Sequence, residues 1–440
     1  MRNSLVDPKV LKKRRQKLGE ATPGSAIVIP AHPEFIRNND VHHAYRQDSN
    51  MFYFSGFEEP ESVMVFRPGL DPEYILFVRE KNVERETWDG FRFGPDMAAS
   101  VFGADRAYPV NDFDRVMVDL LEPVEKIYYR LNWNHEFDSR LFRVLDSLKQ
   151  KRGRSGRGYP PIFDTTEILG DIRLFKTPEE IPLIKKACEI SSEAHVAMMK
   201  AVRPGVNERE IYGKFLSEIM KRGADREAYG AIVASGANAT VLHYRFNDQE
   251  LKKGELILID AGAEYQYYAG DITRTFPVNA KFSKAQKEVY EAVLNIQKKM
   301  IELVKPGIPQ KNMQEECIKL VVQTLLDLGF LSGKASENIE NKSYQKYYMH
   351  GVSHWLGMDV HDAGVYQYKG ESRKLEPNML FTIEPGIYIP LNDTKVPSDY
   401  RGIGVRIEDD VLVTNMGAEV LTTGAPKEVS DLEALIGKGN

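Results

Sequence analysis

Residues 251–262 are LKKGELILIDAG, and residues 375–386, LEPNMLFTIEPG, align on them without a gap. In both stretches an apolar, β-branched run ends in a carboxylate, and the alignment places Asp260 opposite Glu384. Such a run predicts a buried strand, where an unpaired carboxylate is costly unless a cation or several donors lie nearby. Either acid alone is more simply interpreted as a cap on the turn that follows. The matched pair instead favours a shared site.

The sequence around these two stretches also repeats. A helix ending in AVRPGVNE and a second ending in KRG, within 201–223, are matched by helices ending in LVKPGIPQ and LGF, within 303–330. The strand GDITRTFPV, with Asp271, corresponds loosely to VRIEDDVLV, with Glu408. We therefore expect two half-domains related by a pseudo-twofold axis, which bring one acid from each of four strands to the interface between the halves.

Histidines flank the acid-bearing strands. His350 and His354, in HGVSHWLG, have the four-residue spacing of a zinc helix, but Gly351 stands where the zincin pattern requires glutamate. That pattern is therefore excluded. With His243 and His361 they make up four of the nine histidines in the chain, so we interpret them as site residues although a lone histidine is usually structural.

The candidate ligands are four carboxylates and one imidazole: Asp260, Asp271, His354, Glu384 and Glu408. A set rich in oxygen and free of thiolates favours a harder divalent ion, Mn²⁺ first, with Co²⁺, Fe²⁺ or Zn²⁺ as alternatives. Five ligands exceed the three of a catalytic single zinc ion. If two carboxylates bridge, however, they suffice for two ions about 3.5–4 Å apart.

Composition bounds the class of protein. The 440 residues suit two domains, and 42% hydrophobic with 28% charged residues is ordinary for a globular protein. A net charge of −5 does not indicate a nucleic-acid partner, and no stretch approaches the roughly 20 apolar residues of a membrane span. The charged N-terminus lacks a secretory signal, which predicts a cytoplasmic location. Cys188 and Cys317, the two cysteines, lie in helical patterns and are expected to be buried, inert thiols.

A basic, glycine-rich segment at 151–161, KRGRSGRGYPP, predicts a boundary there or just after it. We expect an α/β N-terminal domain at 1–170 and an α+β domain at 171–440. Expected N-terminal elements are helices at 8–18 and 138–150 and the strands SAIVIP, MFYFSGF, SVMVF, EYILFV and KIYYRL. In the second domain, Thr177 should cap a helix running to about Val202, and Asn207 a helix ending near Gly223.

Together and in this order, the motifs IDAG, GDITRTF, HGVSHWLG, TIEPG and VRIED resemble aminopeptidase P, the Xaa-Pro aminopeptidase of the pita-bread metallopeptidases, in its bacterial type. They span about 176–430, and the N-terminal half resembles that family's α/β domain more loosely. The resemblance implies a pita-bread fold. It also implies hydrolysis of the bond between an N-terminal residue and a following proline, with peptides that carry proline second as partners.

The resemblance also assigns metal ligands. Asp271 and Glu408 would bridge two ions, Asp260 would complete one of them, and His354 with Glu384 the other. Glu384 would additionally accept a proton during catalysis.

Further roles follow from the same resemblance. His361, assisted by His243, would stabilise the tetrahedral intermediate, and His350 would line the proline pocket. Arg406, two residues before Glu408 and on the same face of a predicted strand, would anchor Asp260 together with Tyr229. The family also implies a homo-oligomer, a dimer or tetramer, in which Trp88, from a predicted loop, contributes to the pocket.

Several alternatives stay open. A pita-bread binding module would lack the ligands, and creatinase works without metals, whereas all five ligands stand here. Methionine aminopeptidase lacks a long N-terminal domain. An Xaa-Pro dipeptidase would use the same ligands but needs an arginine for the free carboxylate of proline. The position where such an arginine is expected, fourteen residues before Glu384, is Gly370, although Arg373 lies nearby.

Overall fold

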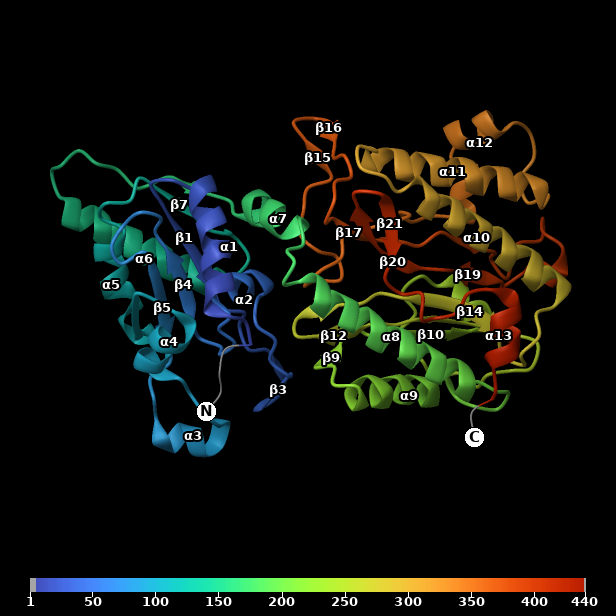
Figure 1. The fold of residues 1–440 in the computed structure, drawn as a ribbon, viewed down its shortest axis with the longest axis horizontal. Helices are drawn as coiled ribbons and strands as arrows, with labels where there is room; N and C mark the ends of the chain where they lie inside the picture. Colours follow the sequence, from blue (N-terminus) through green and yellow to red (C-terminus); the bar gives the residue numbers. More distant parts are fainter. Residues whose placement is uncertain (1–4, 439–440) are drawn as a thin grey trace. The chain divides into compact units, whose positions relative to one another are not determined.

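The computed structural model describes residues 5–438, which form two compact units that divide between Ile172 and Arg173 (Figure 1). The glycine-rich segment 151–161 overlaps the end of helix α6 (His135–Arg152) and continues as irregular chain to strand β8. Helix α7 (Thr166–Leu174) crosses the division. Among the described residues, no helix has the length and apolar character that crossing a membrane requires.

The N-terminal unit is built on a six-stranded mixed sheet in the order β6-β5-β4-β1-β7-β8. Strand β1 pairs antiparallel with β4 and parallel with β7. Four of the five predicted strands are confirmed. The strands are β1 (Ser25–Pro30), β4 (Val63–Phe66), β5 (Tyr74–Val78), β6 (Arg106–Pro109), β7 (Lys126–Tyr128) and β8 (Ile162–Phe163).

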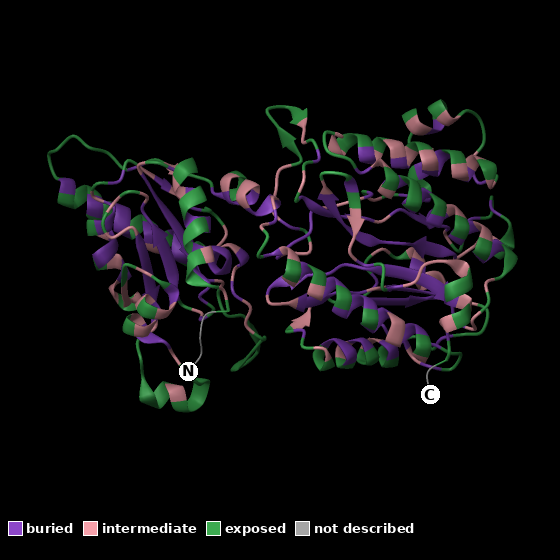
Figure 2. Ribbon diagram, in the orientation of Figure 1, coloured by how far each residue is buried: buried purple, intermediate pink, exposed green. Residues whose placement is uncertain are grey.

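Both faces of this sheet are covered, and Figure 2 shows its central strands as buried. Alternate residues such as Ala26 and Val28 join the core formed with α5 (Phe113–Leu120) and α6. The opposite face is covered by α2, on which α1 packs. This explains why β1, β4 and β5 are continuously apolar rather than alternating. The other elements are α1 (Pro8–Ala21), β2 (Ile36–Asn38), β3 (Val41–His42), α2 (Ser49–Ser55), α3 (Val83–Asp89) and α4 (Gly94–Phe102).

The predicted strand MFYFSGF is wrong, because these residues form most of helix α2 and the turn after it. Asp48 caps the helix, its side chain accepting a hydrogen bond of 2.9 Å from the backbone N–H of Met51. Gly56 ends it with a φ of 67°, in the left-handed region. A short apolar run that is buried on all sides has no periodicity that distinguishes a strand from a helix.

The loop predicted around Trp88 is also wrong. Trp88 lies on helix α3, which Asn82 caps by accepting a hydrogen bond from the backbone of Arg85. Trp88 is 80% exposed and therefore does not pack into the core of its own chain.

The C-terminal unit contains two similar halves, which confirms the predicted duplication and fold class. Each half has a helix pair and a three-stranded antiparallel sheet, β10-β11-β14 or β17-β20-β21. In Figure 1 the green pair α8 and α9 lies on one side of the strands, and α10 and α11 lie on the other. The elements are α8 (Ile181–Ala201), α9 (Glu208–Lys221), β10 (Ile232–Ser235), β11 (Leu256–Asp260), β14 (Thr273–Pro277), α10 (Lys284–Leu303), α11 (Gln310–Asp327), β17 (Leu380–Ile383), β20 (Asp409–Thr414) and β21 (Gly417–Val420).

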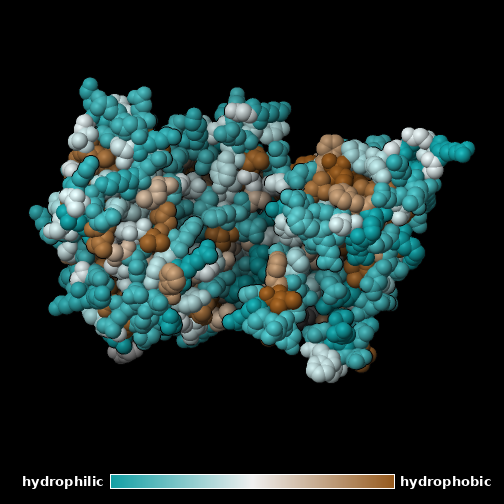
Figure 3. Space-filling view, turned by 180° about the vertical axis from the view of Figure 1, so that it is seen from behind, coloured by the Kyte–Doolittle hydropathy of each residue, from teal (hydrophilic) through white to brown (hydrophobic). Residues whose placement is uncertain are grey.

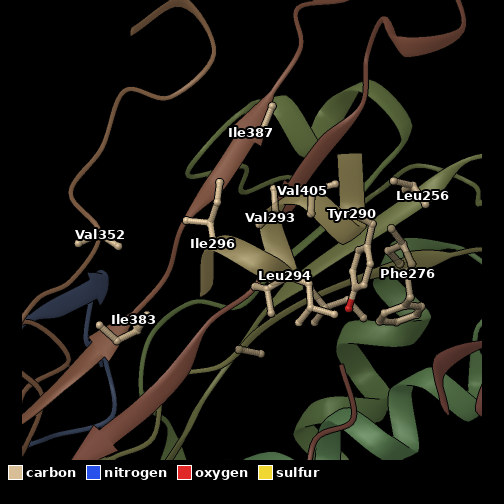
Figure 4. Close-up of a cluster of buried hydrophobic side chains, with 14 of the residues drawn as sticks. Leu256, Phe276, Tyr290, Val293, Leu294, Ile296, Val352, Ile383, Ile387 and Val405 are labelled. Carbon is tan, nitrogen blue, oxygen red and sulfur yellow. The ribbon is translucent and has the colours of Figure 1, made fainter. Parts of the chain in front are cut away.

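One large hydrophobic core contains residues of both halves (Figure 4). Helix α10 contributes Val293 and Ile296 to this core, which also contains Phe276 of β14 and Ile383 of β17. Helix α10 touches β17 and β21 of the second sheet, and the shared core connects it with residues of the first sheet.

The starts of the two first helices test the predicted caps. At Thr177 the capping box is half formed: Glu180 accepts a hydrogen bond from the backbone N–H of Thr177, but the Thr177 hydroxyl has no partner among the described residues. Helix α8 therefore begins at Ile181, a turn later than predicted, and ends as expected at Ala201. At Asn207 the capping box with Glu210 is complete, as predicted.

The remaining features complete the C-terminal unit. Cys188 and Cys317 are buried in α8 and α11 and form no disulfide. The face in Figure 3 is mostly hydrophilic, with hydrophobic side chains in small separate groups. Further elements are β9 (Arg226–Glu227), β12 (Ala263–Tyr265), β13 (Tyr268–Ala269), α12 (Ala335–Glu340), β15 (Gln367–Tyr368), β16 (Glu371–Ser372), β18 (Gly386–Tyr388), β19 (Gly404–Arg406) and α13 (Val429–Leu435).

Candidate metal centre and active site

Four carboxylates lie at matching strand ends of the two halves. Asp260 is the last residue of β11, and Asp271 precedes β14 by two residues; Glu384 directly follows β17, and Glu408 directly precedes β20. The antiparallel pairing of β11 with β14 and of β17 with β20 sets this arrangement. All four carboxylates and His354 line one pocket of about 810 Å³.

The five predicted ligands converge in this pocket. Oxygen atoms of Asp271 and Glu408 and a ring nitrogen of His354 all lie within 4.8 Å of one another. His354 Nε2 is 3.5 Å from Asp271 Oδ2 and 3.4 Å from Glu384 Oε1. Asp260 is joined to the group by Tyr229, whose hydroxyl is 2.6 Å from Asp260 Oδ1 and 2.5 Å from Asp271 Oδ1.

The imidazole of His354 is oriented by its own loop. Its Nδ1 lies 3.1 Å from the carbonyl oxygen of Trp355, which only accepts, so Nδ1 carries a hydrogen and Nε2 faces the carboxylates. The backbone of His354 is held to β17, where Thr382 N–H donates to the His354 carbonyl at 2.9 Å. This is the orientation in which Nε2 serves as a metal ligand.

Arg406 and Thr273 connect the carboxylates behind the site. Arg406 Nη2 donates to Asp260 Oδ2 at 2.7 Å, and its Nε donates to Thr273 Oγ1 at 3.0 Å. The Thr273 hydroxyl then donates to Glu408 Oε2 at 2.6 Å. The single strand predicted for Arg406 and Glu408 is wrong, because β19 ends at Arg406 and β20 begins at Asp409. The two side chains still meet, through Thr273.

The site carries more buried negative charge than its own groups neutralise. Burial raises the pKa of Glu384 to about 7 and holds the pKa values of Asp271 and Glu408 above their ordinary range. Burial acts against the protonation of His354, but hydrogen bonding and charge from Asp271, with the charge of Glu384, raise its pKa to about 9. A bound cation would offset the cost of burying these carboxylate charges next to one another.

The donor set fits divalent cations. It offers four carboxylates and one correctly oriented imidazole, with no thiolate, so oxygen-preferring ions suit it. When bound, such ions would lower the pKa of a water molecule and polarise the scissile carbonyl. The residues that would hold them are Asp260, Asp271, His354, Glu384 and Glu408.

The other predicted histidines also line the pocket. His350 Nε2 is 2.8 Å from the hydroxyl of Tyr388, and burial together with the charge of Arg406 lowers the pKa of His350 to about 4. The ring of His361 stands edge-on to that of His354, with centroids 4.4 Å apart. His243 is an exposed part of the same wall.

Some predicted residues lie elsewhere, and some site residues were not predicted. Arg373 is not among the pocket-lining residues, and Gly370 lies at the turn of the β15–β16 hairpin. Trp88 lies in the N-terminal unit, and its contribution to the pocket of an oligomer stays a prediction. Sequence reasoning missed Thr273 and Arg245. Thr273 follows Asp271 and Arg245 follows His243 by two positions, but nothing local in the sequence marks either side chain as a site residue.

The duplicated fold and the acidic cluster define a metal-dependent hydrolase with an additional N-terminal domain. Residues 182–415 match the model of metallopeptidase family M24, and residues 11–128 match the aminopeptidase P N-terminal domain. The chain belongs to metallopeptidase family M24, and the predicted membership of the aminopeptidase P group is confirmed by the relatives it matches.

These relatives resemble the chain over nearly their full length. The Xaa-Pro aminopeptidase of Escherichia coli K12 is 40% identical over 98% of each chain. The solved structure of Pseudomonas aeruginosa aminopeptidase PepP matches with a TM-score of 0.94 and 44% identity over 98% of each chain. A structure of E. coli aminopeptidase P with the inhibitor Pro-Leu matches with a TM-score of 0.93, at 40% identity over 98% of each chain.

Proposed function

We propose that this metallopeptidase hydrolyses the bond between an N-terminal residue and a following proline and that it uses two divalent cations, Mn²⁺ first among the candidates. The observation that carries the proposal is the convergence of four carboxylates and His354 on one pocket. The Xaa-Pro aminopeptidase of E. coli, similar over the full chain, supports the substrate class.

The geometry of Asp271 supports a bridging role between two ions. Its Oδ1 contacts the Tyr229 hydroxyl, which also contacts Asp260, whereas its Oδ2 faces His354, so the two oxygens point to different parts of the cluster. In the proposal Asp271 and Glu408 serve both ions. Asp260 completes one coordination sphere, and His354 with Glu384 completes the other.

The substrate-contacting roles go to groups around the cations. A proline amide has no N–H to donate, so the pocket has to recognise the ring itself. In the proposal His350, held by Tyr388, lines the proline side. His361 and His243 stabilise the tetrahedral intermediate, and Glu384 takes up the proton released by the attacking water.

A non-catalytic peptide-binding module is the alternative from another class of protein. Such a module has no need to keep buried carboxylates whose pKa values are raised by burial, as those of Glu384 and Glu408 are here. All five candidate ligands are present and face one another, which favours catalysis.

An Xaa-Pro dipeptidase is the second candidate, because it would use the same ligands. It needs a guanidinium fork at the closed end of the site to hold the carboxylate of proline. Arg373, the arginine nearest the expected position, is directed to its own loop: its Nε lies 3.4 Å from the Val365 carbonyl oxygen. It is not part of the pocket wall, which favours the aminopeptidase.

A substrate series separates these functions. We expect the Mn²⁺-loaded protein to cleave Ala-Pro-Ala with a higher kcat/KM than Ala-Pro. It should release alanine from Ala-Ala-Ala much more slowly than from Ala-Pro-Ala. A strict preference for Ala-Pro, lost in Arg373→Ala, would identify a dipeptidase. Binding of Ala-Pro-Ala without cleavage at any metal loading would identify a binding module.

Self-association is a further part of the proposal. Helix α3 carries Val83 and Trp88, which are 82% and 80% exposed, and no residue of this helix is buried. Exposed large apolar side chains of this kind are typical of contact surfaces. We expect a homo-oligomer by light scattering at micromolar concentration, and a shift towards monomer in Trp88→Ser.

A further inference from the structure

We infer, on the basis of the proposed function, that Arg245 is a specificity residue that binds a carboxylate of the peptide beyond the proline. The carboxylate has two sources, the free C-terminus of a short peptide or the side chain of an acidic residue. Arg245 lines the same pocket as the candidate metal ligands.

Arg245 is presented by a segment whose backbone is firmly anchored. His243 and Arg245 line the pocket, whereas Tyr244 between them is buried and donates through its hydroxyl to Glu208 Oε2 at 3.0 Å. The buried Glu208 also accepts from the backbone N–H of Gln249 at 3.0 Å. These contacts on both sides of Arg245 fix its backbone beside the pocket, where its exposed side chain forms part of the wall.

The segment is anchored further along by Asn247. Its side chain accepts from Val233 N–H at 2.9 Å and donates to the Ala231 carbonyl oxygen at 2.8 Å. Both partners lie on or beside β10, the strand that pairs with β11 and Asp260. Arg245 is therefore tied to the same sheet that places a candidate metal ligand.

The guanidinium of Arg245 has no partner among the residues that the structure describes. Of the two pocket arginines, Arg406 is occupied by Asp260, Thr273 and Tyr388. Arg245, by contrast, makes no hydrogen bond or ion pair within residues 5–438. An unpaired planar fork of donors in a binding pocket suits a carboxylate ligand.

The direction of the substrate decides which end of the peptide reaches Arg245. An aminopeptidase substrate carries an ammonium group at its N-terminus, which a guanidinium repels. A carboxylate of the peptide therefore reaches Arg245 from the other side of the scissile bond. The substrate therefore supplies the carboxylate that pairs with Arg245. This pair increases the affinity only for peptides that carry such a carboxylate.

The test uses Mn²⁺-loaded full-length protein and four tetrapeptides. Ala-Pro-Ala-Ala carries a free C-terminus, Ala-Pro-Ala-Ala-amide carries no carboxylate, Ala-Pro-Asp-Ala-amide carries one in a side chain, and Glu-Pro-Ala-Ala-amide carries one before the proline. The variants are Arg245→Met, which keeps the aliphatic stem, Arg245→Lys, which keeps the charge, and Arg209→Met. Arg209 is an exposed residue on α9 outside the pocket and provides the matched loss of charge.

We expect one of the two peptides with a carboxylate beyond the proline to exceed the neutral amide in kcat/KM by about three- to ten-fold. Arg245→Met should remove that advantage while leaving the neutral amide unchanged, and Arg245→Lys should keep part of it. Arg209→Met should behave as the unmodified protein. Whichever peptide shows the effect identifies the source of the carboxylate.

Three outcomes would overturn the inference. In the first, the unmodified protein cleaves the neutral amide and the two peptides with a carboxylate beyond the proline with equal kcat/KM. In the second, Arg245→Met lowers kcat/KM equally for all peptides. The third is a preference for Glu-Pro-Ala-Ala-amide that depends on Arg245. Each of these leaves the proposed function standing, whereas failure to cleave any of the four peptides removes the function and the inference together.

Discussion

Arg406 donates from Nη2 to Asp260 Oδ2 over 2.7 Å, and this contact joins the two halves of the C-terminal unit. Asp260 ends β11 in the first half, and Arg406 ends β19 in the second. The same guanidinium reaches the hydroxyls of Thr273 and Tyr388, each at 3.0 Å. One side chain thereby sets the spacing of acids that come from separate halves of the duplication.

Replacing Arg406 by lysine should weaken the metal centre without emptying the pocket. A lysine ammonium cannot hold Asp260, Thr273 and Tyr388 at once, so we expect Mn²⁺ affinity and kcat/KM to fall by about 10- to 100-fold. Calorimetric metal titration and peptide hydrolysis measure both. Arg401→Lys, outside the pocket, is the control. Unchanged metal affinity in Arg406→Lys would show that the guanidinium does not position Asp260.

The proposed bridging acids should matter most for metal content. Asp271→Ala or Glu408→Ala would remove a ligand from both ions and leave the other carboxylates repelling one another. We expect two Mn²⁺ ions per unmodified chain and a loss of both metal and activity in either variant, measured by elemental analysis and peptide hydrolysis. Asp399→Ala, outside the pocket, should bind as the unmodified protein does. Full activity with one tightly bound ion would contradict the two-metal centre.

The acids of the site could be found in the sequence because their signal is local. An ionisable residue at the end of an apolar run stands out in one stretch of chain, and the duplication gave Asp260 and Glu384 the same position in two such runs. In the structure, each is next to the end of a buried strand. The fold followed for the same reason, because the repeated helix pairs and strands are themselves local patterns.

The contacts around those acids could not be read in the same way. Thr273 joins Arg406 to Glu408 only because two strands from different halves lie side by side, and nothing local in TRTF marks its hydroxyl. Arg245 was missed because it lies in irregular chain, where no periodicity distinguishes the residues facing a pocket. The error at MFYFSGF had a related cause, since burial on all sides removed the periodicity of a helix.

The histidines should separate chemistry from metal binding. His243→Ala and His361→Ala are expected to keep both ions but lower kcat on the order of 10²–10³-fold each, because they would stabilise charge that develops in the transition state. His135→Ala, in the N-terminal unit, is the control. A stoichiometric loss of metal in His361→Ala would make His361 a ligand and change the proposed division of roles.

Metal binding should stabilise the protein more at high pH than at low pH. The pKa of Glu384 is raised from 4.5 to about 7, and that of His354 from 6.5 to about 9. A group whose pKa is higher in the folded than in the unfolded protein stabilises the fold at a pH below its unfolded pKa. This stabilisation is lost as the pH rises through the folded pKa, so the free energy of unfolding of the metal-free protein should fall between about pH 4.5 and 9.

Metal ions compete with those protons for the same ligands, so the stabilisation by bound metal grows as the pH rises over the same range. We expect the rise in Tm on adding Mn²⁺ to be larger at about pH 8 than at about pH 5.5, measured by calorimetry. The doubly substituted Asp271→Asn, Glu408→Gln protein should show little rise at either pH. An equal or larger rise at the lower pH would contradict the shifts.

A buried ion network supports the loop that carries His361. Asp362, the next residue, accepts from Arg173 Nη2 at 2.5 Å and from Lys176 Nζ at 2.8 Å, and its side chain is 1% exposed. Its backbone N–H donates to the Trp355 carbonyl oxygen at 2.9 Å. Although burial opposes ionisation, the charges of Arg173 and Lys176 keep the pKa of Asp362 below its ordinary value. The side chains of Arg173 and Lys176 thus position His361 through the neighbouring Asp362.

Removing one of these cations should disturb both stability and catalysis. Lys176→Met leaves the buried carboxylate of Asp362 with Arg173 as its one cationic partner, so we expect the free energy of unfolding to fall by about 3 kcal/mol. Because His361 would lose part of its support, kcat should fall about ten-fold with the metal content unchanged, and Lys176→Arg should restore most of it. Lys185→Met, which breaks an exposed pair with Glu419, should change stability by about 0.5 kcal/mol or less. Urea unfolding and peptide hydrolysis measure the two effects. A Lys176→Met protein that is less stable but has an unchanged kcat would show that the network has only a structural role.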